Sequence, residues 1–311
     1  MKLKIQIVLI FIGLAANQLL AQQEPQFSQN MFNTLSVNPG YAGSNDAICA
    51  TAIYRNQWTG FVGAPKTGLL NVEAPVKLLK GGVGLTIISD ELGLDNTMFL
   101  KLAYAYHLNI GAGKLGIGLQ AGLTNKTLEA SRFNAFVSDG SDQTIPTQDV
   151  SAGSPTFGFG LFYKTDLYYM GLSSTQLAES LVGYTSDMDY KLKRHYYLKG
   201  GISKRLSSTL EIQPSLFFKF DPPVAPQIDI NALVLYNNQF WGGVSYRVMD
   251  VDALVAIVGL TWNNIKVGYS YDMTLNELRG FSSGSHEIMI GHCFKLNEKI
   301  EAQRYRNVRF L

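Results

Sequence analysis

The sequence predicts an all-β fold, a transmembrane outer-membrane β-barrel of about 14 antiparallel strands that follows a cleaved signal peptide. Two observations carry this prediction. Between residues 47 and 294, short stretches alternate apolar and polar side chains, as strands with one apolar and one polar face do. The links between these stretches alternate between short and long, like the turns and loops at the two ends of an outer-membrane barrel.

Residues 1–21 have the features of a signal peptide. Lys2 and Lys4 flank the start of an apolar run over 5–14, and the small residue Ala21 marks the expected cleavage site. The run is too short for a transmembrane helix, which needs roughly 20 residues. Removing Lys2 and Lys4 from the 26 Lys and Arg leaves as many basic residues as the 24 Asp and Glu. This neutral balance argues against nucleic acid as a partner.

Residues 22–46 form an N-terminal segment ahead of the first strand. Phe27, Met31 and Phe32 are placed either to pack inside the barrel as a plug or to lie on its periplasmic rim. Glycines on the inward faces of the strands would leave room for a plug.

The barrel itself is expected over 47–294. Its clearest strand has Leu100, Leu102 and Tyr104 on one face, towards lipid, and Lys101 and Ala103 on the other, towards the lumen. Pro214 interrupts one of the strands, and a bulge there would absorb its missing N–H. The expected strands span 47–57, 67–76, 82–89, 100–108, 115–124, 156–164, 167–177, 195–205, 210–220, 227–236, 240–248, 253–262, 265–272 and 285–294.

The lengths of the links predict the orientation of the barrel. Short turns are expected at 77–80, 109–112, 165–166, 206–208, 237–239 and 263–264. Longer loops are expected at 58–66, 90–96, 126–154, 178–194 and 273–284, with two shorter members of the same set at 221–226 and 249–252. Short turns are periplasmic and long loops extracellular in such barrels, so an even number of strands leaves both termini in the periplasm.

A soluble β-sandwich is the alternative fold, since its strands alternate in the same way. The length of the strands and the one-sided loops favour the barrel. Aromatic residues near the strand ends are expected to form girdles at the two membrane interfaces, where the outer surface meets membrane lipid and lipopolysaccharide. They are Tyr163, Tyr168, Tyr169, Tyr196, Tyr197, Trp241, Tyr246, Trp262, Tyr269 and Tyr271.

The first and last strands of a closed barrel are antiparallel neighbours, which predicts a structural seam. If Cys49 lies opposite Cys293, then Arg55 lies opposite Glu287, because the two pairs have the same sum of residue numbers. We therefore expect a luminal Arg55–Glu287 pair near the outer end and the two cysteines near the periplasmic end. The cysteines either form a disulfide, which an oxidising compartment permits, or stay free.

Several residues are candidates for binding a partner, each with a simpler alternative. Gln57 and Trp58, beside Arg55, either hold a partner protein or belong to a structural cluster in the lumen. Asp90 binds a partner or a cation, or else caps its own turn. Phe133 and Phe136 lie in the long loop, which is exposed enough to present them to a partner.

Residues 295–311 form a C-terminal tail that is expected in the periplasm. The tail is basic and partly apolar, and is either a docking site for an acidic domain or a solvated extension. Its candidate binding residues are Arg304, Tyr305, Arg306 and Arg309.

Short motifs along the chain resemble one known family. They are Pro25-Gln26-Phe27-Ser28-Gln29 with Asn33, Asn38-Pro39-Gly40-Tyr41-Ala42-Gly43, Arg55-Asn56-Gln57-Trp58 with Gly60, Ala64-Pro65-Lys66-Thr67, Gly82-Val83-Gly84-Leu85 up to Asp90, Ala103-Tyr104-Ala105-Tyr106, and Ser285-His286-Glu287-Ile288. Their order and spacing resemble the PorP/SprF outer-membrane proteins of the type IX secretion system. The family usually has alanine where this chain has Gly40.

The resemblance implies an integral barrel that works with periplasmic or outer-membrane components of type IX secretion. It also implies a role in the export or surface attachment of a partner secreted protein with a C-terminal sorting domain, such as a gliding adhesin. The family branch that belongs to the core apparatus and the branch paired with one secreted protein both remain open.

A porin or transport channel for small solutes is the alternative function, with a lumen lined by Lys101, Glu211, Lys219, Asp229 and Asn231. An enzyme is not expected, because no Ser, His and acidic residue fall at one membrane depth on neighbouring strands. No cofactor and no metal site are expected either.

Overall fold

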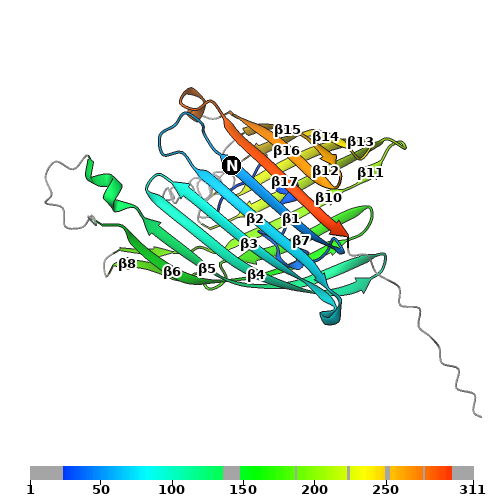
Figure 1. Cartoon of the computed structure of the whole chain (residues 1–311), viewed down its shortest axis with the longest axis horizontal. Helices are drawn as coiled ribbons and strands as arrows, with labels where there is room; N and C mark the ends of the chain where they lie inside the picture. Colours follow the sequence, from blue (N-terminus) through cyan, green and yellow to red (C-terminus); the bar gives the residue numbers. More distant parts are fainter. Residues whose placement is uncertain are drawn as a thin grey trace, which may run out of the picture.

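A computed structural model describes residues 24–135, 148–185, 188–222, 225–248, 253–275 and 277–295. The signal peptide and the C-terminal tail therefore fall outside the part of the chain that the structure covers. Within that part, fourteen antiparallel strands form a closed barrel (Figure 1). The strands are β1 (Ala47–Asn56), β2 (Lys66–Val76), β3 (Gly81–Leu92), β4 (Asp95–Ile110), β5 (Gly113–Leu128), β6 (Val150–Lys164), β7 (Tyr168–Thr175), β10 (His195–Ile202), β12 (Leu210–Phe220), β13 (Gln227–Tyr236), β14 (Phe240–Val248), β15 (Ala253–Trp262), β16 (Ile265–Thr274) and β17 (Ser285–Lys295).

The sheet closes because its first strand pairs with its last. β1 runs antiparallel to β17, and the chain of neighbours continues around the ring until β10 pairs with β12. Figure 1 shows β1 between β2 and β17 on the near wall of the barrel. All the expected strands are present, and no helix among the described residues is long and apolar enough to cross a membrane.

Apolar side chains cover the outer surface of the wall. In β4, Leu102 is 62% exposed while its neighbours Lys101 and Ala103 are buried in the lumen. Leu119 of β5 and Val258 of β15 are exposed in the same way, on strands whose adjacent residues face inwards. A wall with an apolar exterior and a filled interior is the arrangement expected in lipid.

The two ends of the barrel differ, and we call them the short-turn end and the long-loop end. Two-residue turns such as Asn263-Asn264, both with positive φ, join strands at the short-turn end. At the other end lie the longer connections, including η4 (Ala130–Ala135) and η5 (Glu277–Gly280). A separate hairpin, β8 (Leu181–Thr185) with β9 (Met188–Lys191), occupies part of the connection between β7 and β10.

Two local predictions were wrong. The loop expected at 90–96 is a tight turn, because β3 and β4 continue their pairing up to Leu92 and Asp95. The bulge suggested at Pro214 is absent, since β12 keeps one register with β13 along its whole length. Instead, the ladder on the other side of β12 ends where Gly201 lies opposite Ser215, next to Pro214, which has no N–H to donate. It resumes with the short β11 (Lys204–Arg205).

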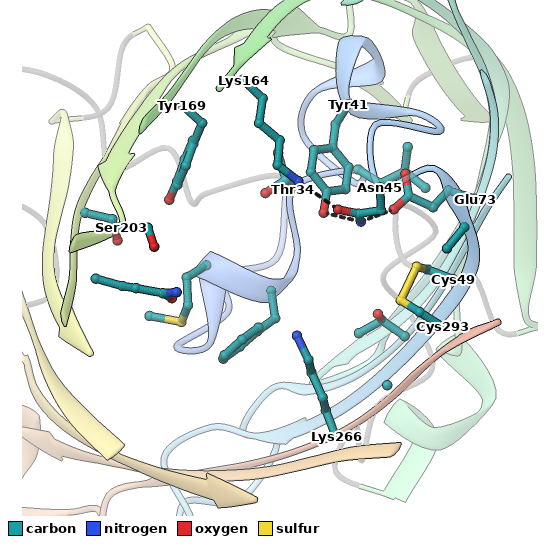
Figure 2. Close-up of a pocket in the computed structure, with 18 of the residues that line it drawn as sticks. Thr34, Tyr41, Asn45, Cys49, Glu73, Lys164, Tyr169, Ser203, Lys266 and Cys293 are labelled. Carbon is teal, nitrogen blue, oxygen red and sulfur yellow. Dashed lines mark hydrogen bonds between the residues drawn. A yellow bond between two sulfur atoms is a disulfide. The ribbon is translucent and has the colours of Figure 1, made fainter. Parts of the chain in front are cut away.

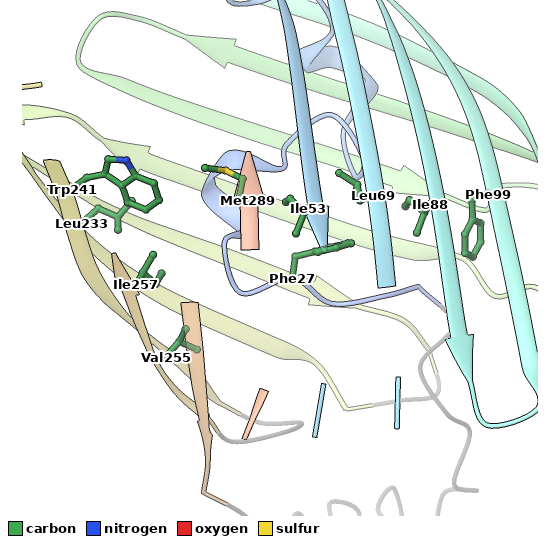
Figure 3. Close-up of a cluster of buried hydrophobic side chains, with 10 residues drawn as sticks. All are labelled: Phe27, Ile53, Leu69, Ile88, Phe99, Leu233, Trp241, Val255, Ile257 and Met289. Carbon is green, nitrogen blue, oxygen red and sulfur yellow. The ribbon is translucent and has the colours of Figure 1, made fainter. Parts of the chain in front are cut away.

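The segment ahead of β1 lies inside the barrel, and we call residues 24–46 the plug. It contains the short helices η1 (Asn30–Phe32) and η2 (Pro39–Tyr41). Phe27 belongs to a cluster of buried apolar side chains that eight strands point inwards (Figure 3), which are Ile53, Leu69, Ile88, Phe99, Leu233, Trp241, Val255, Ile257 and Met289. The inner face of the wall is therefore partly apolar where the plug contacts it.

The plug also changes where some aromatic residues point. Trp241 is 7% exposed, and its ring lies 4.8 Å from the ring of Phe32 in the plug. Tyr197 is buried in the lumen, and Tyr169 lines an internal cavity. These three were expected in the membrane girdles and face inwards instead, whereas Trp262 and Tyr246 are exposed on the outer surface.

Candidate functional site

The seam between β1 and β17 has the register that the sequence predicts. Cys49 lies opposite Cys293, and Arg55 lies opposite Glu287. The two cysteines form a disulfide with their Cα atoms 4.1 Å apart, at the end of the seam nearest the short turns. Arg55 and Glu287 face the lumen with almost no exposed surface, and their side chains come within 3.3 Å.

A network of buried charges extends from this pair across neighbouring strands. Arg55 contacts Asp272 of β16 at 2.8 Å, and Asp272 also lies 3.6 Å from Arg247 of β14. Arg247 in turn pairs with Asp229 of β13 at 3.0 Å. All these side chains are buried, so each charge depends on its partners for the solvation that water would otherwise supply.

The plug is anchored to this network by its backbone and side chains. The backbone N–H groups of Ser28 and Gln29 each donate to one oxygen of the Glu287 carboxylate, both at 2.8 Å. The Ser28 hydroxyl donates to Asp272 at 2.6 Å and accepts from Arg55. The buried acids on the last two strands thus hold the beginning of η1 in place.

Glu24 forms a second anchor on the opposite wall. Its carboxylate pairs with Lys101 of β4 at 3.1 Å and accepts from Tyr197 of β10 at 2.6 Å and from Thr175 of β7 at 3.1 Å. Burial alone would raise the pKa of the Glu24 carboxyl, but Lys101, His195 and the Tyr197 hydroxyl outweigh it and hold the pKa well below its usual range. The acid is therefore ionised, and it ties the start of the plug to three strands.

The plug backbone also approaches the wall where the wall consists of glycine. A Cβ atom at Gly40 would lie 2.8 Å from the carbonyl oxygen of Gly116 and 2.9 Å from that of Gly160. Asn38 fixes this turn, because its side chain accepts from the Gly40 N–H at 2.8 Å and donates to the Leu161 carbonyl at 3.0 Å. A side chain at position 40 would therefore collide with the wall, and the inward glycines do make room for the plug.

Three of the residues predicted to bind partners, Gln57, Trp58 and Asp90, lie near the long-loop end. Gln57 accepts a weak hydrogen bond from Arg55 at 3.4 Å, and the backbone N–H of Trp58 donates to the Ser285 hydroxyl at 3.1 Å. Both residues therefore lie beside the seam. This position fits the alternative that they belong to a structural cluster. Asp90 accepts from the Thr67 hydroxyl at 2.6 Å within the β2–β3 pair, so it does not cap a turn.

The remaining candidates are not tested by the structure. The backbone of Phe133 belongs to η4 but its side chain is not described, and Phe136 lies beyond the described range. The tail residues Arg304, Tyr305, Arg306 and Arg309 follow the last described residue. Among the described residues, no group of His, Cys, Asp or Glu could hold a metal ion.

Sequence reasoning missed most of the anchoring residues. Asp272 and Arg247 have inward parity near the long-loop ends of their strands, which is a usable signal for buried charge. Glu24 lies in a segment without periodicity, and its sequence context gives no comparable signal. Lys101, Lys219, Asp229 and Asn231, proposed as the lining of an open channel, are buried against the plug instead.

Comparison with solved structures returns barrels of low sequence identity. The CymD monoaromatic hydrocarbon channel is 13% identical, with 90% of this chain and 96% of that chain covered and a TM-score of 0.49. A Pseudomonas aeruginosa FadL homologue is 13% identical, with coverages of 79% and 88% and a TM-score of 0.42. The Ralstonia pickettii toluene transporter TbuX is 13% identical, with coverages of 80% and 88% and a TM-score of 0.41.

Comparison with families gives a definite result. No curated protein sequence matches the chain. The family described as type IX secretion system membrane protein PorP/SprF matches residues 19–292, which include the plug and nearly the whole barrel. Together with the closed barrel, this match places the protein in the outer membrane. The chain belongs to the PorP/SprF family of type IX secretion membrane proteins.

Proposed function

We propose that this protein is a closed docking barrel that supports the export or cell-surface attachment of one secreted protein. Family membership supports a role beside the type IX machinery. The observation that carries the proposal is the anchored plug, because a barrel whose lumen is held shut by buried ion pairs is suited to binding proteins at its ends.

The proposed partners follow from the proposed orientation. With the short-turn end in the periplasm, β17 ends on that side, where the tail that follows it can meet periplasmic components of the machinery. The plug begins nearer the long-loop end, because Glu24 contacts Thr175 of β7 and Tyr197 of β10, so the two ends of the described chain do not lie on one side. The long-loop end then faces the exterior and meets the secreted protein, which carries a C-terminal sorting domain. Lipid and lipopolysaccharide surround the wall, and we propose no catalytic activity.

The alternative function is a channel for small solutes. An open channel needs a continuous aqueous path, and the plug residues that contact opposite walls oppose one. Planar-bilayer recording on the purified protein separates the two functions. We expect a closed barrel, with steady conductance far below that of an open porin, and a large steady conductance would favour the channel.

The secretion role is tested in the native cell. Deletion of the gene should remove one protein, or a small set, from the cell surface and the medium, and expression of the intact chain should restore it. Pull-down of the intact protein from mild detergent should recover the same secreted protein. If the full set of surface proteins is unchanged after deletion, the proposed role is wrong.

A further inference from the structure

The half of the lumen nearest the short-turn end contains a cavity of about 660 Å³ (Figure 2). The plug closes its inner end with Met31 and Phe32, and the wall contributes the apolar side chains of Leu233 and Met289. Turn residues such as Asn264 lie at its open rim. The rest of the lining mixes apolar with polar and charged side chains. The volume is within the range of about 300–1,000 Å³ that is typical of small-molecule sites.

Lys266 of β16 provides the polar feature that distinguishes this cavity. Figure 2 shows its side chain pointing from the wall towards the middle of the space. Its Nζ atom lies 5.8 Å from the centre of the Phe32 ring, and no carboxylate of the described residues pairs with it. The side chain is exposed to the open cavity, and an ammonium group there without a paired carboxylate attracts an anion.

The acidic groups near the cavity do not serve as that counter-charge. The carboxylate of Glu73 accepts from the Gly43 N–H at 2.9 Å and from the Asn45 side chain at 2.6 Å. Asn45 also accepts from Lys164 at 3.0 Å, so these groups satisfy one another. Asp166 lies at the rim and is exposed to solvent.

We propose that the cavity binds a single carboxylate carried on an apolar chain. The carboxylate lies against Lys266, and the chain lies along Met31, Phe32 and the neighbouring wall. Three lysines line the cavity, Lys164, Lys266 and Lys295, and the ammonium of Lys266 lies beside the apolar ring of Phe32. This lysine is therefore placed to meet a carboxylate whose apolar chain contacts the plug, which a small hydrated anion does not have. A free fatty acid and the apolar C-terminal end of a polypeptide share this chemistry. The inference goes beyond the proposed function, since docking at the barrel ends does not require an occupied cavity.

The test measures binding to the full-length protein in nanodiscs by isothermal titration calorimetry at neutral pH, with empty nanodiscs subtracted. The probes are decanoate against decanol, and acetyl-Val-Phe-Leu as the free acid against its amide. We expect at least one acid to bind about tenfold more tightly than its neutral counterpart, as a hydrogen-bonded charge pair predicts. Tighter binding of decanoate identifies a lipid source, and tighter binding of the peptide acid identifies a polypeptide source; either supports the proposal.

Variants assign the effect to the cavity. Lys266→Gln should weaken binding of the preferred acid about tenfold, and Lys266→Arg should retain most of it. The matched control is Lys204→Gln, which removes the same charge from an exposed lysine that does not line the cavity. Gly291→Phe should also weaken binding, because the ring fills the cavity without changing its charge. The wall can accept this substitution, since the nearest atom to a Cβ at this position lies 3.5 Å away.

The proposal is overturned if neither acid binds, or if acids and neutral probes bind equally. Wild-type affinity in Lys266→Gln, or an equal loss in Lys204→Gln, overturns it as well. These binding results come from the purified protein alone. The secretion role is tested independently, by the gene deletion.

Discussion

Substitution of Glu287 by Gln should release the plug from the seam. The carboxylate accepts the backbone N–H groups of Ser28 and Gln29 and contacts Arg55. Glutamine keeps the shape but has one acceptor oxygen, so at least one of the two backbone hydrogen bonds is lost and Arg55 loses a charged partner.

The size of the effect follows from these contacts. Hydrogen bonds to charged groups contribute about 1.5–3 kcal/mol each, and breaking a buried ion pair costs about 3–5 kcal/mol. We therefore expect Glu287→Gln to weaken the anchoring of the plug by about 3 kcal/mol. This corresponds to a rise of roughly a hundredfold in the population of the released plug.

Planar-bilayer recording provides the assay. Wild-type protein should remain closed, and Glu287→Gln should show frequent openings together with a lower temperature of unfolding on heated gels. Glu211→Gln is the matched control, because the hydrogen bonds of Glu211 within the described part of the chain are to Ser203 and Gln213 and not to the plug. A Glu287→Gln barrel that stays as closed and as heat-stable as the wild type would refute the reasoning.

Three further predictions concern the seam and the plug. Replacing both Cys49 and Cys293 by serine should lower the free energy of unfolding by about 2–4 kcal/mol, and reductant should then have no further effect on heated gels. Gly40→Ala should lower the free energy of unfolding by about 1–3 kcal/mol, because the added Cβ meets carbonyl groups of the wall. Gly68→Ala is the control and should have little effect, since a Cβ there has no atom within 4 Å. Equal effects of the two substitutions in urea unfolding would contradict this. Folding lowers the pKa of Glu24. The carboxylate therefore stabilises the fold at pH values above its pKa in the unfolded chain, and this stabilisation is lost as the pH falls through its pKa in the folded protein. The stability difference between wild type and Glu24→Gln should therefore be constant from pH 8 to about pH 5 and narrow only below about pH 4, and a difference that vanishes near neutral pH would contradict the ion pair.

The barrel and its seam could be predicted because both depend on the period of two residues. Apolar side chains such as Leu102 and Val258 must face lipid, which fixes the parity of each strand. Antiparallel pairing keeps the sum of residue numbers constant, so one assumed contact between Cys49 and Cys293 also determines the contact of Arg55 with Glu287.

The charge network and the plug could not be predicted in the same way. Whether Arg247 reaches Asp272 depends on the curvature of the wall, which strand periodicity does not contain. Trp241 follows another aromatic residue, Phe240, so the pattern does not say which of the two faces lipid. Its inward position is decided by Phe32, a residue of the plug far away in the sequence.

The join between β1 and β17 bears on how a polypeptide could pass this protein. Some membrane barrels part their first and last strands to open a sideways exit into the bilayer. Here that movement would require reduction of the Cys49–Cys293 disulfide, separation of ten residue pairs, and removal of Arg55 from two carboxylates. Under the proposed function, a secreted chain would therefore travel around the barrel or along its ends and not through a gap between β1 and β17.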